Sequence, residues 1–255
     1  MTRAIMNGCN GKMGQCITGI CAQDPDIEIV AGIDTYDGIK NDYPVFKSLA
    51  DCDVEADVII DFSIVKAVDA LIDHCVEKQI PVVLCTTGLS EEQLDKVEKA
   101  YEKVAILKSA NMSLGINMLL KILKEATEIL APAGFDIEIV EKHHNQKLDA
   151  PSGTAIMTAD KIDAARKEAG VQPAPHKTHE SLDGARGASV DGIPIHSVRL
   201  PGYIAHQQVL FGGYGELLTI RHDSMDRKSF MPGVVLAVKK VSSRPGLTFG
   251  LENYL

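Results

Sequence analysis

The sequence predicts an α/β protein in two parts, a doubly wound parallel sheet followed by a mixed α+β region. Two observations support this prediction. Short apolar runs alternate with helical patterns through the first third of the chain, and after about Asn111 the pattern changes to long helices and turn-rich strands. Strands that alternate with helices of about ten to fifteen residues are typical of βαβ units, whose parallel sheet carries helices on both faces.

In the first part, buried strands are expected at RAIMNG (3–8), IEIVAGID (27–34), ADVIIDFS (56–63), PVVLCTTG (81–88) and VAILKSAN (104–111). Apolar residues at helical spacing predict helices over 12–23, 66–79 and 90–103. Ser90 is placed to cap the last of these helices, and Gln93 completes a capping box three residues later.

In the second part, a long amphipathic helix (117–131) precedes FDIEIVEKHH (135–144), which alternates like a strand with one covered face. A helix over 154–170 ends at Gly170 as its C-cap. The residues after it, 172–192, are rich in Pro, Gly, His and Asp and predict a long loop. Three antiparallel strands (194–202, 205–213, 215–224) and a helix over 230–241, with Pro232 in its first turn, complete the chain.

The composition is that of an ordinary globular protein, with 255 residues, 45% hydrophobic and 24% charged. A net charge of -9 disfavours nucleic acid as a partner, because such a chain repels phosphate backbones. No apolar run approaches the roughly 18 to 20 residues of a membrane span, and the N-terminus lacks the apolar core of a signal peptide. The six cysteines form no CxxC pair, so reduced thiols and a cytoplasmic location are expected.

The stretch IMNGCNGKMGQ places Gly8, Gly11 and Gly14 between the first strand and the first helix. Glycines there permit a tight turn and let N–H groups approach a pyrophosphate at the helix start. The spacing is GxxGxxG rather than GxGxxG, and Asn10 stands at the middle glycine. Asn tolerates a left-handed backbone, so this departure is mild. Alone, the pattern fits a nucleotide loop and a plain strand–helix turn equally.

Asp34 ends the second strand, 20 residues after Gly14. A dinucleotide fold places there the carboxylate that holds the ribose hydroxyls, although an exposed acid at a strand end is common. The order of strand, glycine loop, helix, strand and acid favours dinucleotide binding. A carboxylate repels a 2′-phosphate, Thr35 and Tyr36 supply no cation, and only Lys12 could. NADH is therefore expected to bind at least as well as NADPH, with dual use left open.

The stretch EKHHNQKLDAPSGTA (141–155) is open to three interpretations: a metal site, an acid–base pair beside an anion pocket, or a solvated loop. Adjacent histidines on an extended segment point to opposite sides, so His143 and His144 do not easily face one ion together with Glu141. No further ligand has a characteristic metal spacing, and no metal is expected.

An acid beside an anion pocket fits these residue types better. A histidine can be protonated near neutral pH, and a nearby lysine stabilises developing negative charge. The turn before the helix would present N–H groups and hydroxyls to carboxylates at a helix N-terminus. The helix start alone could be merely a good cap, so it is the combination that favours a site.

Five motifs together resemble the dihydrodipicolinate reductase family: the glycine loop with KMG, DFS (61–63), TTG (86–88), ANMSLGIN (110–117) and EKHHNQKLDAPSGTA. The resemblance covers nearly the whole chain, in order. It implies an N-terminal Rossmann-type domain (1–114, completed by 226–255) and an α+β domain (115–225) that binds substrate and forms a homotetramer. It also implies reduction of 4-hydroxy-tetrahydrodipicolinate to tetrahydrodipicolinate by NADH or NADPH, in the diaminopimelate route to lysine.

By the same resemblance, His143 would be the general acid and Lys147 the cation beside the reacting ring. The substrate carboxylates would be bound by His144, Ser152, Gly153, Thr154 and Thr87. The cofactor would be lined by Gly8, Asn10, Gly11, Lys12, Met13, Gly14, Asp34, Phe62, Cys85, Thr86, Gly88, Ala110, Asn111 and Met112. Two residues depart from the family pattern, which usually has Gly at 85 and often an aromatic residue at 112. Cys85 is therefore expected to crowd the edge near the nicotinamide, and Met112 to weaken packing against the cofactor.

Two other functions remain open on the sequence: a Rossmann dehydrogenase acting on an amino or oxo acid such as aspartate, and a sensor that binds NADH without turnover. The first fits the HHNQKLDAPSGT string poorly, because that string suits a ring flanked by carboxylates. The second needs no His–Lys pair beside a helix start. Arg199 and Arg227 could steer an anion, but a surface role is expected for both.

Overall fold

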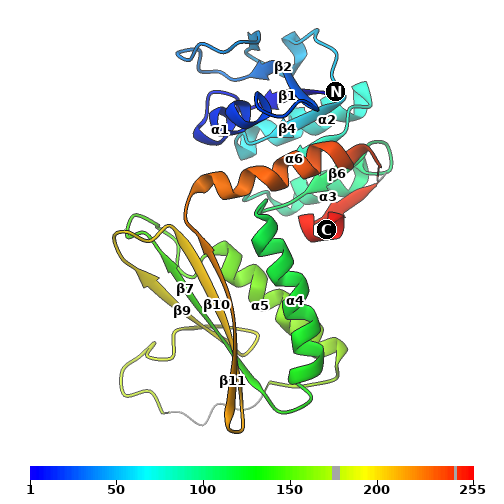
Figure 1. Ribbon diagram of the computed structural model, residues 1–255. Helices are drawn as coiled ribbons and strands as arrows, with labels where there is room; N and C mark the ends of the chain where they lie inside the picture. Colours follow the sequence, from blue (N-terminus) through cyan, green and yellow to red (C-terminus); the bar gives the residue numbers. More distant parts are fainter. Residues whose placement is uncertain (174–178, 244–245) are drawn as a thin grey trace. The chain divides into compact units, whose positions relative to one another are not determined.

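The computed structural model describes residues 1–173, 179–243 and 246–255, and the side chain of Arg227 is outside this description. The chain forms two compact units (Figure 1). Met1–Leu114 and Phe230–Leu255 make up the first, and Gly115–Ser229 the second. The second unit therefore ends at Ser229 rather than at the predicted residue 225.

The first unit is built on a seven-stranded sheet in the order β12-β6-β5-β4-β1-β2-β3, with every neighbouring pair parallel. Its strands are β1 (Thr2–Asn7), β2 (Ile27–Ile33), β3 (Val45–Phe46), β4 (Val58–Asp61), β5 (Val82–Leu84), β6 (Ile106–Lys108) and β12 (Leu247–Phe249). The chain runs outward from β1 to β3 and then returns to β4 on the other side of β1. Such a reversal leaves a crevice at the carboxyl ends of the strands, where ligands of doubly wound sheets bind.

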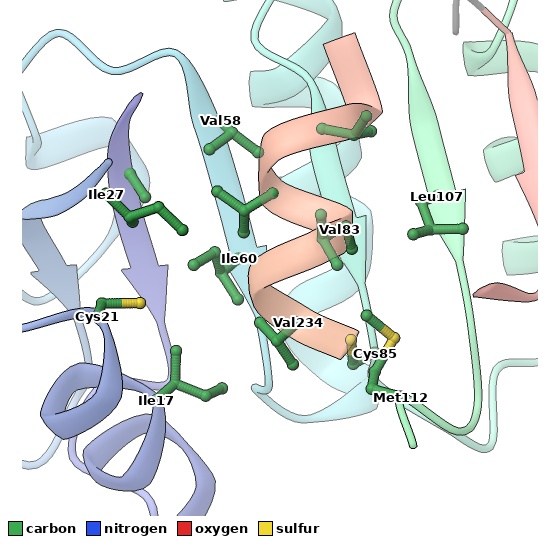
Figure 2. Packing of buried hydrophobic residues seen from close by; sticks show 14 of the residues in the cluster. Ile17, Cys21, Ile27, Val58, Ile60, Val83, Cys85, Leu107, Met112 and Val234 are labelled. Carbon is green, nitrogen blue, oxygen red and sulfur yellow. The ribbon is translucent and has the colours of Figure 1, made fainter. Parts of the chain in front are cut away.

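Helices cover both faces of this sheet, as the alternating pattern predicts. They are α1 (Lys12–Cys21), α2 (Val68–Lys78), α3 (Glu91–Ala100) and α6 (Met231–Lys240). One core contains residues of α1 and α6, and a second core contains residues of α2 and α3. Figure 2 shows the first of these, in which Val234 of α6 packs with Ile60 and Val83 of the sheet. Each fully buried side chain of this size stabilises the fold by roughly 1.5 to 3 kcal/mol.

The predicted capping box of α3 is confirmed. The hydroxyl of Ser90 accepts from the N–H of Gln93, whose side chain in turn accepts from the N–H of Ser90. Pro232 lies in the first turn of α6, also as predicted.

The second unit is built on a five-stranded sheet in the order β11-β10-β7-β9-β8. Its strands are β7 (Asp136–His143), β8 (Ala188–Val190), β9 (Ile193–Arg199), β10 (Ala205–Gly213) and β11 (Glu216–Ser224). The prediction of three consecutive antiparallel strands is wrong for β9, which pairs with β7 in parallel and not with β10. Strand β7 lies between them, because the chain leaves β7 through α5 (Gly153–Glu168) and returns as β9 in the same direction. The predicted loop over 172–192 includes β8, and residues 174–178 lie outside the described part.

One face of this second sheet packs against α5 and against α4 (Leu114–Leu130). Alternate residues of β7 point into this core, beginning with Ile137 and Ile139. The next residue in the same row is Glu141, whose side chain is fully buried. Among the described helices, none is long and apolar enough to cross a membrane.

Candidate active site

The glycine loop between β1 and α1 is held by main-chain contacts. Gly8 has φ +82°, and a Cβ there would lie 2.6 Å from the carbonyl oxygen of Phe62. A Cβ on Gly14 would lie 2.2 Å from the carbonyl oxygen of Gly8. Gly11 caps α1 without a side-chain hydrogen bond, and Lys12 and Met13 begin the helix. The first N–H groups of a helix have no acceptor within it, so this start can receive an anion such as a pyrophosphate.

Asn10 contributes to the glycine loop through its side chain and not through a left-handed backbone. Among the described non-glycine residues only Gln79 and Asp191 have positive φ, so Asn10 is not left-handed. Its side-chain amide donates to the carbonyl oxygen of Tyr36 at 2.5 Å, and its side-chain oxygen accepts from Asn41 at 2.8 Å. Asn10 therefore ties the loop to the segment that follows β2 through its side chain.

Asp34 lies beside the glycine loop, as the spacing predicts. Its carboxylate accepts from the N–H of Asn10 at 2.9 Å and from the N–H of Tyr36 at 3.0 Å. The sequence did not predict the cation nearby, Lys47, which donates to the carbonyl oxygen of Thr35 at 2.9 Å and to Asp37 at 2.7 Å. This hydrogen bond lowers the pKa of Asp37. Lys47 comes from the loop around β3, which gave no recognisable pattern.

Asp61, at the end of β4, organises the carboxyl edge of the sheet. Its fully buried carboxylate accepts from the amide of Asn7 at 2.8 Å and from the hydroxyls of Ser63 and Thr86, both at 2.6 Å. The ammonium of Lys108 donates to the carbonyl oxygen of Thr86 at 2.8 Å, and burial lowers its pKa. Thr86 of the TTG motif is thus fixed through both its side chain and its main chain. The sequence pointed to DFS but assigned no role to Asp61.

The other predicted residues of this unit fall into two groups. Thr87, Gly88 and Ala110 are exposed, and Gly88 has φ +77°. Phe62 and Asn111 serve the local structure: the N–H of Phe62 donates to the carbonyl oxygen of Asn7 at 3.0 Å, and the side chain of the buried Asn111 accepts from the N–H of Ser113 at 2.9 Å.

Cys85 and Met112 do not project from the edge of the sheet. Both are buried in the core that contains α6, at 8% and 2% exposure, and they lie close together in Figure 2. Burial and the charge of Asp61 raise the pKa of the Cys85 thiol. The roles expected for Cys85 and Met112 at the cofactor remain predictions, made for side chains that lie in this core.

In the second unit, the end of β7 carries a tightly bonded charge cluster. Glu141 and His143 lie two residues apart on the strand, so they share a face. Nδ1 of His143 is 2.5 Å from Oε2 of Glu141. The guanidinium of Arg199, in β9, donates to both oxygens of Glu141 at 2.7 and 2.9 Å. The N–H of Ser152 reaches the same carboxylate at 3.3 Å.

Glu141 is a charged group in the interior. Burial on its own would raise the pKa of Glu141, but hydrogen bonds from His143 and Arg199 outweigh it and lower the pKa to about 2. The expected surface role of Arg199 is wrong, since its side chain is 18% exposed and spans from Glu141 to the carbonyl oxygen of Asp149. The sequence missed this because no spacing links Arg199 to Glu141, 58 residues apart. The side chain of Arg227 lies outside the described residues.

The start of α5 follows within ten residues of β7. Ser152 caps it, and its hydroxyl accepts from the N–H of Ala155 at 3.2 Å. A Cβ on Gly153 would meet nothing within 4 Å, so the space in front of the helix start is open. Thr154 occupies the next position of α5 and is half-buried.

The loop between β7 and α5 contains the remaining two predicted residues. The ammonium of Lys147 is 2.7 Å from Asp149, and its N–H closes a turn onto the carbonyl oxygen of His144 at 3.2 Å. Nδ1 of His144 is buried without a hydrogen-bond partner among the described residues. The structure thus brings His143, His144, Lys147 and the start of α5 together in one strand–loop–helix segment. Within the described residues, no group of three or more His, Cys, Asp or Glu is arranged to hold a metal.

The fold and these residues define a class, the dinucleotide-binding proteins with a Rossmann-type sheet and a second, mixed unit. Two family models match almost the whole chain: "Dihydrodipicolinate reductase, N-terminus" over residues 2–112 and "Dihydrodipicolinate reductase, C-terminus" over 115–255. The chain belongs to the dihydrodipicolinate reductase family. The second model continues through residues 230–255, which the structure groups with the first unit.

Individual relatives agree over their full lengths. The chain is 43% identical to a 4-hydroxy-tetrahydrodipicolinate reductase of Caldanaerobacter subterraneus, over 97% of this chain and 96% of the relative. It is 40% identical to that of Corynebacterium urealyticum, over 100% and 99% of the two chains. Among solved structures, the dipicolinate-bound dihydrodipicolinate reductase of Paenisporosarcina sp. TG-14 superposes with a TM-score of 0.87, at 38% identity and full coverage of both chains.

Proposed function

We propose that this chain reduces 4-hydroxy-tetrahydrodipicolinate to tetrahydrodipicolinate with NADH or NADPH, in the diaminopimelate route to lysine. The observation that carries the proposal is the His143–Glu141 pair beside the open start of α5, in a chain whose full-length relatives are named for this reaction. The reaction replaces a ring hydroxyl by hydrogen, so it consumes one hydride and one proton and releases water. A bound reduced nicotinamide supplies the hydride.

His143 is proposed as the general acid. Its Nδ1 is engaged by Glu141, so Nε2 is the nitrogen that can deliver a proton to the reacting ring. Lys147 is proposed as the cation that stabilises negative charge developing on the ring, and its hydrogen bond to Asp149 fixes its position.

The start of α5 is proposed to bind the substrate carboxylates. The helix dipole and the N–H groups of its first turn favour an anion, and Gly153 leaves the approach open. Ser152 and Thr154 flank this glycine, and His144 has a buried ring nitrogen that still lacks a partner. The exposed Thr87 of the first unit is proposed to contribute its hydroxyl. The dipicolinate held by the relative from Paenisporosarcina is a ring dicarboxylate of this kind.

The glycine loop is proposed to hold the cofactor pyrophosphate, with the first turn of α1 at Lys12 and Met13 as donors, and Asp34 is proposed to hold the adenosine ribose. NADH is proposed to bind at least as tightly as NADPH. A carboxylate repels a 2′-phosphate, and the charge of Lys47 is already neutralised by Asp37. Lys12 is exposed and supplies the cation that keeps NADPH usable.

Assembly and location complete the proposal. A homotetramer through the sheet of the second unit is supported by exposed apolar residues near its edge, Tyr214, Leu217 and Leu218, on and before β11. A cytoplasmic location is supported by the six free cysteines and the biosynthetic role of the named relatives.

The test is oxidation of NADH and of NADPH by the purified chain, with enzymatically generated substrate. His143→Ala is expected to lower kcat by roughly 10²- to 10⁴-fold, the usual loss for a missing general acid. Cofactor affinity should change little. His74→Ala, in α2 of the first unit, is the matched control and should turn over normally.

Three outcomes would count against the proposal. No oxidation with either nicotinamide removes the reductase assignment, and normal turnover by His143→Ala removes His143 as the acid. A Kd for NADPH far below that for NADH contradicts the role given to Asp34.

A further inference from the structure

A carboxylate occupies a core position of β7. Ile137 and Ile139 point into the core beneath α5, and Glu141 continues the same row with no exposed surface. Burying a charge is costly unless it is paired and hydrogen-bonded. An apolar residue would satisfy the packing requirement of this row. The presence of a carboxylate therefore calls for a reason beyond packing.

The donors to Glu141 come from three places in the second unit. His143 is on the same strand, the side chains of Arg199 and Ser197 are on the neighbouring β9, and the N–H of Ser152 belongs to the cap of α5. Arg199 also donates to the carbonyl oxygen of Asp149, in the loop between strand and helix, at 2.8 Å. The carboxylate of Glu141 thus bonds to His143, the proposed acid, at the end of β7. It also bonds to the cap of α5, at the other end of the loop, where the substrate carboxylates are proposed to bind.

We propose that Glu141 is the positioning residue of the reduction: it holds the Nδ1–H of His143 and so directs Nε2 toward the substrate. This inference rests on the function proposed for His143. The logic is that of any histidine whose second ring nitrogen is fixed by a carboxylate, which sets both the tautomer and the orientation of the ring.

The charges around the ring oppose one another. Glu141 places a negative charge beside the ring, whereas Arg199, bonded to the same carboxylate, adds a positive one. From β10, the residues opposite His143 and Glu141 are Ala205 and Gln207, which carry no charge. The loop adds Lys147 and Asp149, which are paired with each other, and the neighbouring His144. Removing Glu141 and removing Arg199 therefore change the net charge beside the ring in opposite directions.

The experiment compares the pH dependence of kcat/KM in Glu141→Gln, Arg199→Gln and the wild type. Glu141→Gln should move the alkaline limb to lower pH by about one to three pH units, the usual effect of losing a close opposite charge. It should also lower kcat about 10- to 100-fold, with little change in the Kd of NADH. Arg199→Gln should move the alkaline limb to higher pH. A merely structural role would move neither limb, or both in one direction.

A matched control lies on the same strand. Glu138 bonds His196 at 2.8 Å and also pairs with Arg186, so it has the same partner types on the opposite face of the sheet. Glu138→Gln should leave the pH profile unchanged. An equal shift in Glu138→Gln would overturn the assignment, because it would show a general charge effect.

If the Glu141→Gln variant fails to fold, a second measurement on the wild type tests the same inference. Nitrogen NMR of the histidine rings in the wild type, with His143 assigned from His143→Asn, should show the neutral ring protonated at Nδ1. A neutral ring protonated at Nε2 overturns the inference. An inactive wild type, or an active His143→Ala, overturns the proposed function instead, so the two failures are distinct. An unshifted pH profile in a folded, active Glu141→Gln overturns the positioning role alone.

Discussion

The two helix starts proposed to bind ligands, those of α1 and α5, are built in different ways. The start of α1 is fixed by main-chain contacts: Gly8 and Gly14 lie against backbone atoms, and Gly11 caps the helix without a side chain. The start of α5 is fixed by side chains, since Ser152 caps the helix and Glu141 binds the N–H of Ser152.

Each start is also anchored by a carboxylate at the end of a strand. Asp34 accepts from the N–H of Asn10 and is half-buried, whereas Glu141 is fully buried and is bonded to the side chains of His143 and Arg199. The comparison indicates that the geometry of the α1 start depends on the space available to its glycines. The geometry of the α5 start depends on the charge of Glu141. Substitutions should separate these two dependences.

The largest effect is expected for Gly14→Ala. The new Cβ would lie 2.2 Å from the oxygen of Gly8 and 2.8 Å from Cα of Cys9, so the loop must move. We expect the free energy of unfolding, measured by denaturant unfolding, to fall by about 3 kcal/mol or more. We also expect NADH binding, measured by fluorescence titration, to be lost. Gly19→Ala, in the same helix with no atom within 4 Å, is the control and should be as stable as the wild type or more so. Equal stability of the two variants would contradict a steric limit at α1.

The next effect is the acid sensitivity of the second unit. The pKa of Glu141 is about 2 when folded, below its ordinary 4.5. Because the folded value is the lower one, the stabilisation is present above pH 4.5 and is lost as the pH falls toward 2. It amounts to about 3 kcal/mol at most. Denaturant unfolding across this range should show a steeper loss in the wild type than in Glu141→Gln. Parallel curves would mean that the charge of Glu141 is not coupled to folding.

The smallest effect on stability is expected for Gly153→Ala. The added methyl group enters open space at the first position of α5, so the free energy of unfolding should change by less than about 0.5 kcal/mol. Affinity for dipicolinate should nevertheless fall roughly tenfold, about 1.4 kcal/mol, since the methyl group occupies the space before the helix start. Calorimetric titration measures this. Unchanged affinity would remove the start of α5 as the carboxylate site.

Most of the fold could be predicted because periodicity and caps are local signals. The alternation of FDIEIVEKHH and the box of Ser90 and Gln93 both depend on neighbours within a few residues. Strands β3 and β12 were missed because they are very short and, unlike the equally short β5 and β6, do not lie in a longer apolar run of the sequence. The parallel pairing of β9 with β7 was missed because strand partners are chosen by the tertiary fold.

The site shows the same division. Segment 143–154 was predicted as strand end, loop and helix start, and these are its observed elements. Asp61, Glu141 and Arg199 were not singled out for the roles they have, because their importance comes from burial and from partners 25 to 58 residues away. Glu141 did leave one signal, a charge in the apolar row of Ile137 and Ile139. Such a break in the alternation is worth examining in related chains.

The first unit is discontinuous, and this affects its synthesis. Strand β12 forms the edge of its sheet, and α6 supplies part of one core, yet both come from residues 230–255. Residues 115–229 leave the ribosome before residues 230–255 are synthesised. The second unit, which is continuous, can therefore fold while translation proceeds, whereas in the first 114 residues the sheet face that α6 later covers is covered only by α1. During synthesis, the N-terminal part of the nascent chain is therefore the part most accessible to chaperones.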